Sequence, residues 1–203
     1  MPIIVTDFEQ NSPEWYRARL GSVGASSVDK IITSKGEPSK QRTDYLYQLA
    51  GEILTGRAEE TYQSQAMING HEREAASRVL FEMIYGIEVK QCALVYKDER
   101  KLFHCSPDGL VWDNEPLELK NPMMKTQIKY LLSGNLPPEY FIQTQMQLYV
   151  CETERGYFMS CYDGLRPLIV PVYRDEAFLA KLEHELETFV CELAEIVEKL
   201  SKE

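Results

Sequence analysis

The sequence lacks the features expected of a membrane or secreted protein. It has no run of about 18 apolar residues, so no transmembrane helix is expected. Its first residues have neither the basic start nor the apolar core of a signal peptide, so we expect a cytoplasmic protein. The five cysteines are odd in number and contain no Cys-x-x-Cys, which favours neither a disulfide framework nor a zinc site.

Positive charge is also scarce, with 22 basic against 32 acidic residues and a net charge of −10. This balance argues against a nucleic-acid partner, because phosphate binding normally requires Lys and Arg. The distribution of the charge weakens that argument. Residues 175–203 hold nine acidic and three basic residues, a net −6, whereas residues 15–42 hold six basic and two acidic residues, a net +4. The sequence therefore allows a local basic surface on an acidic protein.

The length of 203 residues suits one domain with a substantial hydrophobic core, and we expect a single domain over residues 1–203. Capping residues and apolar periodicity predict a helix that begins near Ser12 and further helices over residues 25–33, 43–54, 65–85, 139–150 and 175–200. Alternating patterns predict strands over residues 87–95, 101–105, 110–112, 117–120, 155–162 and 168–173. This order of elements predicts an α/β sandwich with a mixed sheet.

Two short motifs near the middle of the chain point to a specific chemistry. Ser106-Pro107-Asp108-Gly109-Leu110 is followed by Leu117-Glu118-Leu119-Lys120. Taken singly, the first is typical of a β-turn and the second of any half-buried strand. Together they supply two carboxylates and a lysine. Carboxylates can hold Mg²⁺, which activates a water and neutralises charge on a phosphate. The combination predicts metal-dependent phosphodiester cleavage.

This hypothesis sets a condition on the hairpin that joins the two motifs. The glutamate and the lysine lie two residues apart and therefore share one face of their strand. A symmetric two-residue turn at residues 113–114 would place Asp108 on the opposite face. A three-residue connection over residues 113–115 would pair Asp108 with Lys120, and a bulge near Gly109 would serve equally well. We predict one of these irregularities, and a regular two-residue hairpin would contradict the metal site.

Two other regions have both a structural and a functional interpretation. Glu74 is either an exposed helix acid or a third carboxylate supporting the same metal, and Arg78 beside it is expected on the surface. Gln145 and Tyr149 lie four residues apart, so they share one helical face. They form either a polar helix edge or a Gln–Tyr pair that faces the metal site, where the amide would bond to phosphate or to a metal-bound water.

The segment around Arg19 has no certain meaning from its residues alone. Arginine forks suit phosphate oxygens, and Ser26 or Ser27 at a helix N-terminus would make an anion site. The structural alternative is a core Trp15 with two surface arginines. The isolated histidines His104 and His184 are expected to be structural.

With these motifs in order, the chain resembles the phage lambda-type alkaline exonucleases of the PD-(D/E)XK nuclease superfamily. The resemblance runs from about Trp15 to Tyr173. Each block is unremarkable singly, but all of them in this order and at these separations are specific. The blocks are Trp15-Tyr16-Arg17-Ala18-Arg19-Leu20-Gly21 with Ala25-Ser26, Gly70 with Glu74, Ser106-Pro107-Asp108-Gly109-Leu110, Leu117-Glu118-Leu119-Lys120 and Gln143-Thr144-Gln145.

The resemblance implies a restriction-endonuclease-like core, with a central mixed sheet flanked by helices. It implies an enzyme that digests one strand of linear double-stranded DNA from the 5′ end. The products would be mononucleotides and a 3′ single-stranded overhang. The resemblance also implies a homotrimeric ring whose central channel takes the duplex. Such a ring would explain processive digestion. Family members usually work with a single-strand annealing protein in recombination.

The resemblance also implies residue roles. Each active site would hold two Mg²⁺ ions, for which Mn²⁺ could substitute. The expected metal ligands are Asp108, Glu118 and the backbone carbonyl of Leu119, with Glu74 as a further acid that assists them. Lys120 matches the catalytic lysine. The expected contacts to DNA and its 5′-phosphate are Arg19, Ser26, Gln143 and Gln145. The family often has a cysteine or another small residue after the lysine, where this chain has Asn121.

Two alternatives remain at the level of sequence. One is another PD-(D/E)XK nuclease, such as a structure-specific or restriction-type endonuclease. Covalently closed DNA discriminates between the two, because an exonuclease should leave it intact. The other is a non-catalytic DNA-binding or assembly protein with a decayed site. The intact set of Asp108, Glu118 and Lys120 argues against decay.

Overall fold

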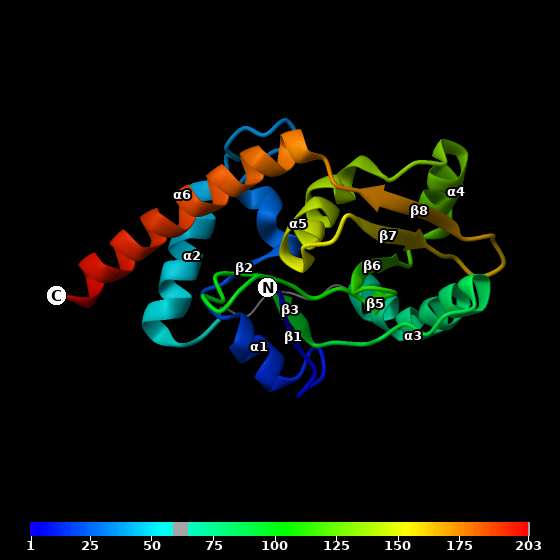
Figure 1. The fold of residues 1–203 in the computed structure, drawn as a ribbon, viewed down its shortest axis with the longest axis horizontal. Coiled ribbons are helices and arrows are strands. Elements are labelled where there is room, and N and C mark those ends of the chain that lie inside the picture. Colours follow the sequence, from blue (N-terminus) through cyan, green and yellow to red (C-terminus); the bar gives the residue numbers. More distant parts are fainter. Residues whose placement is uncertain (59–64, 203) are drawn as a thin grey trace.

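The strands of this chain form two four-stranded sheets with helices around them (Figure 1). The computed structural model describes the backbone of residues 1–58 and 65–202, and the side chains of these residues except 65–72. The first sheet has the order β1-β3-β4-β2 and the second the order β5-β6-β7-β8. The predicted α/β class with mixed sheets and flanking helices is confirmed, and the single central sheet of the prediction is divided into two.

The first sheet is built from short strands in the order β1 (Ile3–Val5), β3 (Leu94–Tyr96), β4 (Phe103–Cys105) and β2 (Val23–Gly24). Its β2–β4 pair is parallel and its other pairs are antiparallel. The sequence did not predict β1 or β2. The predicted strand over residues 87–95 is reduced to β3, because the segment before it pairs at one position only, the isolated bridge between Lys90 and Leu110.

The second sheet contains β5 (Gly109–Val111), β6 (Glu115–Lys120), β7 (Arg155–Ser160) and β8 (Leu168–Tyr173). Its central pair, β6 and β7, is parallel, and its outer pairs are antiparallel. The chain crosses from β4 in the first sheet to β5 in the second through Ser106-Pro107-Asp108. Proline has no N–H to donate to a strand partner, which suits it to this break. Asp108 therefore stands where the two sheets meet.

Local signals explain where the helices begin and end. Ser12 caps the first helix by accepting a hydrogen bond from the Trp15 N–H at 3.2 Å, and Asp175 caps the last one through the Phe178 N–H at 3.0 Å. Gly86, at φ +66°, ends the long third helix. The elements are α1 (Pro13–Arg19), η1 (Ala25–Lys30), α2 (Arg42–Thr55), α3 (Gln65–Tyr85), α4 (Met124–Ser133), η2 (Pro138–Tyr140), α5 (Phe141–Cys151) and α6 (Glu176–Ser201).

Helix α5 lies at the centre of the molecule, between η1 and α6 on one side and β6 and β7 on the other (Figure 1). Every residue from Thr144 to Cys151 is buried. The apolar face predicted for α6 packs on this core through Phe178, Leu182, Leu186, Phe189 and Leu193. A second apolar cluster, around Phe81 and Leu117, joins α3 to the second sheet. The central position of α5 allows it to present side chains to both sheets.

Two predicted elements differ from the structure. The segment expected as a helix over residues 25–33 is a shorter 3₁₀ helix, η1. No element was predicted for α4, which buries only Gln127 and Tyr130. Within the described parts of the chain, no helix combines the length and apolar character needed to cross a membrane.

Candidate active site

The hairpin of β5 and β6 meets the condition that the metal-site hypothesis set. Its register pairs Gly109 with Leu117 and Val111 with Glu115, so the connection is the three residues Trp112–Asn114. The regular pairing ends at Gly109, because the N–H of the preceding Asp108 also donates to the Leu117 carbonyl, and the Asp108 side chain reaches the Leu119 N–H. The predicted odd connection is confirmed in kind, but it begins one residue earlier than residues 113–115. The prediction that Asp108 pairs with Lys120 is therefore wrong.

Asp108 is held across the edge of the hairpin by three hydrogen bonds. Its backbone N–H donates to the Leu117 carbonyl at 3.0 Å, and its Oδ2 accepts from the Leu119 N–H at 2.6 Å. The Arg78 Nε donates to the Asp108 carbonyl at 3.0 Å. Arg78 also donates from Nη2 to Oε1 of Glu74 at 2.6 Å. The expectation that Arg78 lies on the surface is wrong, because this residue fastens α3 and Glu74 to the aspartate.

Glu118 is a buried carboxylate with a donor on each oxygen. The Gln143 amide donates to Oε1 at 2.7 Å, and the Gln147 amide donates to Oε2 at 2.5 Å. The Lys120 ammonium forms an ion pair with the same Oε1. These donors come from α5 and from the strand itself, so the packing of α5 on β6 fixes the orientation of the carboxylate.

Gln145 does not face this site, although the sequence analysis assigned it there. Its amide nitrogen donates to the Tyr173 carbonyl at 2.8 Å, and its amide oxygen accepts from the Asp175 N–H at 2.8 Å. It therefore ties the end of β8 to the start of α6. The residue that the prediction missed is Gln147, which lies four after Gln143 and so shares its helical face.

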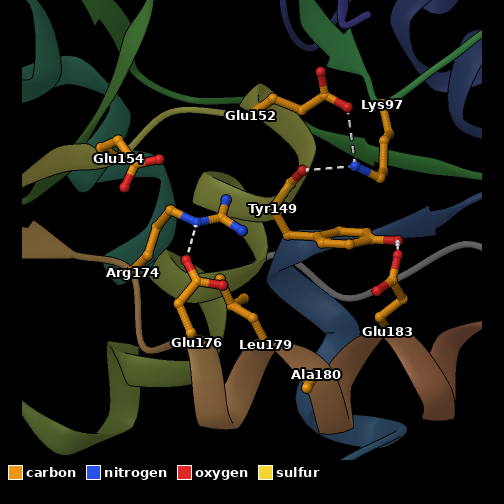
Figure 2. Close-up of a pocket in the computed structure, with 9 residues that line it drawn as sticks. All are labelled: Lys97, Tyr149, Glu152, Glu154, Arg174, Glu176, Leu179, Ala180 and Glu183. Atoms are coloured by element: carbon orange, nitrogen blue, oxygen red, sulfur yellow. Dashed lines mark hydrogen bonds and ion pairs between the residues drawn. The ribbon is translucent and has the colours of Figure 1, made fainter.

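Tyr149 also points away from the carboxylates. It lines a cavity of about 450 Å³ on the other side of α5, where its hydroxyl meets Oε1 of Glu183 at 3.4 Å (Figure 2). The Lys97–Glu152 and Arg174–Glu176 ion pairs line the same cavity. The predicted Gln–Tyr pair facing the metal site is therefore wrong for both residues.

The Asp108 carboxyl group is buried close to other carboxylates. Burial raises the pKa of Asp108 well above its ordinary value, and the carboxylates of Glu118 and Glu74 raise it further. The Lys120 ammonium and the Leu119 N–H oppose this rise without overcoming it. A divalent cation among these oxygens would relieve the repulsion, so the donor set fits Mg²⁺ or Mn²⁺.

The side chains alone do not form a complete metal cage. Across the described residues, no three His, Cys, Asp or Glu side chains converge as metal ligands. A cation here would complete its coordination with a backbone carbonyl, substrate oxygens and water. Mg²⁺ is usually bound in this way, through one or two carboxylates, retained waters and phosphate.

Lys120 is charged in this arrangement. Burial acts to lower the pKa of its ammonium, but the carboxylates of Glu118 and Asp108 outweigh burial and hold the pKa above its ordinary value. The side chain is 30% exposed, and its ammonium pairs with the buried Glu118 carboxylate. Lys120 therefore acts here as a positively charged donor.

Arg19 lies at the end of α1, where Trp15 and His104 hold its guanidinium. Its guanidinium stacks on the Trp15 ring, 3.8 Å from the centroid, and its Nε donates to Nε2 of His104 at 3.0 Å. The Trp15 Nε1 donates to Oγ of Ser106, two residues before Asp108, at 3.0 Å. A chain of contacts thus connects Arg19 to the hairpin, and Trp15 is buried as the structural alternative expected.

Of the two serines considered as anion ligands, only Ser26 is exposed. Ser27 is half-buried. Because η1 is a six-residue 3₁₀ helix, it does not provide the longer α-helical N-terminus on which the anion-site argument depended. Ser26 is available beside Gly24 near Arg19, and its role stays a prediction.

The fold and this arrangement of side chains define the class of protein, a PD-(D/E)XK nuclease of the lambda-type alkaline exonuclease kind. The family can also be stated. The domain model of the YqaJ-like viral recombinase family matches residues 14–154, and the chain belongs to that family.

Solved structures agree with this assignment. The alkaline exonuclease LHK-Exo from Laribacter hongkongensis superposes with a TM-score of 0.84 at 32% identity, covering 94% of this chain and 97% of that one. The same values hold for LHK-Exo in complex with dAMP. A phage-related exonuclease from Haemophilus somnus 129PT shares the fold, with a TM-score of 0.64 at 15% identity over 88% of this chain and 96% of that one.

One curated relative is much longer than this chain. Uncharacterized protein R354 of Acanthamoeba polyphaga mimivirus is 25% identical over 171 residues. The match covers 77% of this chain but only 30% of that protein. It extends the sequence relationship and assigns no activity.

Proposed function

We propose that this chain is a Mg²⁺-dependent exonuclease that digests one strand of linear double-stranded DNA in the 5′→3′ direction. The observation that supports it most is the hairpin of β5 and β6, which brings the carboxylates of Asp108 and Glu118 and the ammonium of Lys120 close together. The products are mononucleotides and a 3′ single-stranded overhang. The similarity to LHK-Exo, which has a structure with the mononucleotide dAMP, supports this product.

The metal-binding groups of the proposal are Asp108, Glu118, the Leu119 carbonyl and Glu74. When bound, two Mg²⁺ ions, or Mn²⁺ in their place, would activate a water and neutralise charge on the attacking and leaving oxygens. Gln143 and Gln147 fix the orientation of the Glu118 carboxylate, which would be one of the groups that hold the metal. The Lys120 ammonium donates to the attacking water or to the scissile phosphate.

The cut that releases a mononucleotide defines the next substrate end. Water adds to phosphorus, the P–O3′ bond breaks, and the leaving 3′ oxygen takes a proton. The departing nucleotide carries its own 5′-phosphate, and the shortened strand ends in a new 5′-phosphate. In the proposal, Arg19 grips this terminal phosphate and Ser26 lies beside it, so each cut regenerates the group that the enzyme recognises.

The family relationship also supports a processive enzyme that works with a partner protein. A homotrimeric ring around the duplex would keep the enzyme on its substrate between cuts. The 3′ overhang would then be taken by a single-strand annealing protein in recombination.

The experiment that separates this function from its alternatives compares linear and covalently closed duplex DNA in Mg²⁺. The proposal expects the linear duplex to be digested and the closed circle to stay intact. Cutting of the closed circle would favour an endonuclease of the same superfamily. Failure to cut any linear duplex in Mg²⁺ or Mn²⁺ would favour a non-catalytic DNA-binding protein.

We predict that Arg19→Ala selectively weakens the use of 5′-phosphorylated ends. Hydrogen bonds to charged groups contribute about 1.5–3 kcal/mol each, so the preference for 5′-phosphate over 5′-hydroxyl ends should fall by at least about tenfold. The measurement is kcat/KM on the two kinds of end. Arg17→Ala is the matched control, because Arg17 is an exposed arginine on the same helix. An unchanged preference in Arg19→Ala would refute the role of Arg19.

We also predict opposite outcomes for two glutamines of α5. Gln147→Leu removes a donor from Glu118 and should lower the cleavage rate by about tenfold or more, comparable to losing a charge-assisted hydrogen bond. Gln145→Leu leaves the Asp175 N–H and the Tyr173 carbonyl without this partner. It should lower the free energy of unfolding by about 1–3 kcal/mol and spare the rate of the folded enzyme. Urea unfolding and initial rates distinguish the two variants, and a reversed pattern would contradict the orientation of α5.

A further inference from the structure

His104 is buried in β4 and uses both of its ring nitrogens. Nε2 lies 3.0 Å from Nε of Arg19, and Nδ1 lies 2.9 Å from Oγ of Ser22. A guanidinium can only donate, so Nε2 must be the nitrogen without a proton. The proton is therefore on Nδ1, which donates to the Ser22 hydroxyl. The two neighbours together select one tautomer of the imidazole.

This tautomer persists over the pH range in which a nuclease would work. Burial, and after it the charge of the Arg19 guanidinium, lower the pKa of His104 to about 3. The ring therefore stays neutral, and Nε2 keeps the lone pair that receives the Arg19 N–H. The burial of His104 and its two bonds fit the structural role expected from the sequence, and the bond to Arg19 has a further consequence.

The bond between Arg19 Nε and His104 leaves the two Nη groups of the guanidinium available to a ligand. Trp15 covers one face of the guanidinium and His104 occupies its Nε. Along the described segments, Nη1 and Nη2 have no hydrogen bond to protein, so the terminal fork is the part that can meet a ligand. Gly24 makes this fit possible, since a Cβ there would lie 2.9 Å from Nε2 of His104 and 3.7 Å from Nη2 of Arg19.

We infer that His104, supported by Ser22, is a positioning residue that orients the Arg19 fork and thereby sets the strength of 5′-phosphate recognition. The inference rests on the proposed binding of the terminal phosphate by Arg19. A guanidinium held by Nε cannot rotate freely, so less conformational freedom is lost when its two Nη groups meet phosphate oxygens.

The residues that hold Arg19 also connect end recognition to the reacting groups. His104 lies on β4, directly before the Ser106-Pro107-Asp108 segment, and Trp15 bonds to both Ser106 and the Ala93 carbonyl. The support of Arg19 and the carboxylate of Asp108 are thus fixed to one stretch of backbone. This arrangement keeps the separation between the terminal phosphate and the scissile bond constant from one cut to the next.

Two conservative substitutions separate the two nitrogens. His104→Asn keeps a polar group near the Nδ1 position and loses the acceptor for Arg19, whereas His104→Gln keeps an acceptor near the Nε2 position. The readout is the ratio of kcat/KM on 5′-phosphorylated to 5′-hydroxyl duplex ends. We expect His104→Asn to lower this ratio by about tenfold through the KM of the phosphorylated substrate, and His104→Gln to retain most of it.

An Arg19→Ala background tests whether His104 acts through Arg19. In that background His104→Asn should lower the ratio no further, whereas independent effects would multiply. Thermal unfolding of each variant checks the fold. If His104→Asn does not fold, Ser22→Ala serves instead, since it removes the partner of Nδ1 and should also lower the ratio.

The outcomes distinguish this inference from the proposed function. A wild-type enzyme without any preference for 5′-phosphate would overturn the proposed role of Arg19, and the inference with it. A wild-type preference that persists in folded His104→Asn would overturn the inference alone. So would an equal loss on both kinds of end, because that is the signature of a general structural defect. Nitrogen-15 NMR of the imidazole gives a separate check, and a protonated Nε2 in His104 would also contradict it.

Discussion

Asp108→Asn is expected to lower the cleavage of linear duplex DNA by at least about 10³-fold, equivalent to about 4 kcal/mol of transition-state stabilisation. The aspartate uses one oxygen to accept the Leu119 N–H and has a second oxygen for a metal ion. The single oxygen of asparagine will bond to the Leu119 N–H, which leaves an amide NH₂ that cannot bind a cation. Initial rates in Mg²⁺ and DNA binding without metal measure the two consequences, and binding should persist.

The stability of this variant gives an independent check. Burial, Glu118 and Glu74 raise the pKa of Asp108, so its ionised form destabilises the metal-free fold. This loss of folding free energy begins as the pH rises above the pKa of Asp108 in the unfolded chain. It is complete once the pH exceeds the raised pKa in the folded protein. At neutral pH, the metal-free Asp108→Asn protein should therefore be at least as stable as the wild type. Asp113→Asn is the matched control, since Asp113 is an exposed acid in the same hairpin and should keep full activity. Near-normal turnover of Asp108→Asn would refute the metal site.

Lys120→Met is expected to lower the single-turnover cleavage rate by about 10²–10³-fold, as when one catalytic charge donor is removed. Its ammonium pairs with Oε1 of Glu118 in the metal-free site. Removing it takes a competing cation away from that oxygen, which keeps its bond to the Gln143 amide, so Mg²⁺ or Mn²⁺ should bind at least as tightly as in the wild type. Asp108→Asn should lose metal affinity and rate together, whereas Lys120→Met should lose rate alone.

Calorimetric Mn²⁺ titration and single-turnover rates test this separation. Lys125→Met is the control, because Lys125 is an exposed lysine a few residues further along the chain. A fall in metal affinity in Lys120→Met as large as that in Asp108→Asn would contradict the account, because it would assign the lysine a role in building the metal site.

The strand face that carries the proposed catalytic residues could be predicted because it depends on local periodicity. Residues two apart on a strand share a face, so Glu118 and Lys120 were placed together by spacing alone. The parity argument required an odd connection, and the structure has one. The position of this connection was missed because it begins at Trp112, which adopts φ +42°. Bulky residues rarely take this conformation, whereas Asp and Asn take it more often, so the turn was expected to begin at Asp113.

The role of α5 could not be predicted to the same degree. Spacing by four pairs Gln143 with Gln147 as readily as Gln145 with Tyr149. Which pair faces Glu118 depends on how α5 packs between η1, α6 and β6, and residues distant in the sequence set that packing. The same limit explains why Arg78 was expected on the surface and why His104 was not connected to Arg19.

Digestion of linear duplex DNA labelled at either the 5′ or the 3′ end, with and without Mg²⁺, tests the central claim most directly. The account predicts no cleavage without metal. With Mg²⁺, the 5′ label should leave first as a mononucleotide, faster from phosphorylated than from hydroxyl ends, while the 3′ label stays on long strands. Cleavage without a divalent metal, or early release of the 3′ label, would contradict it.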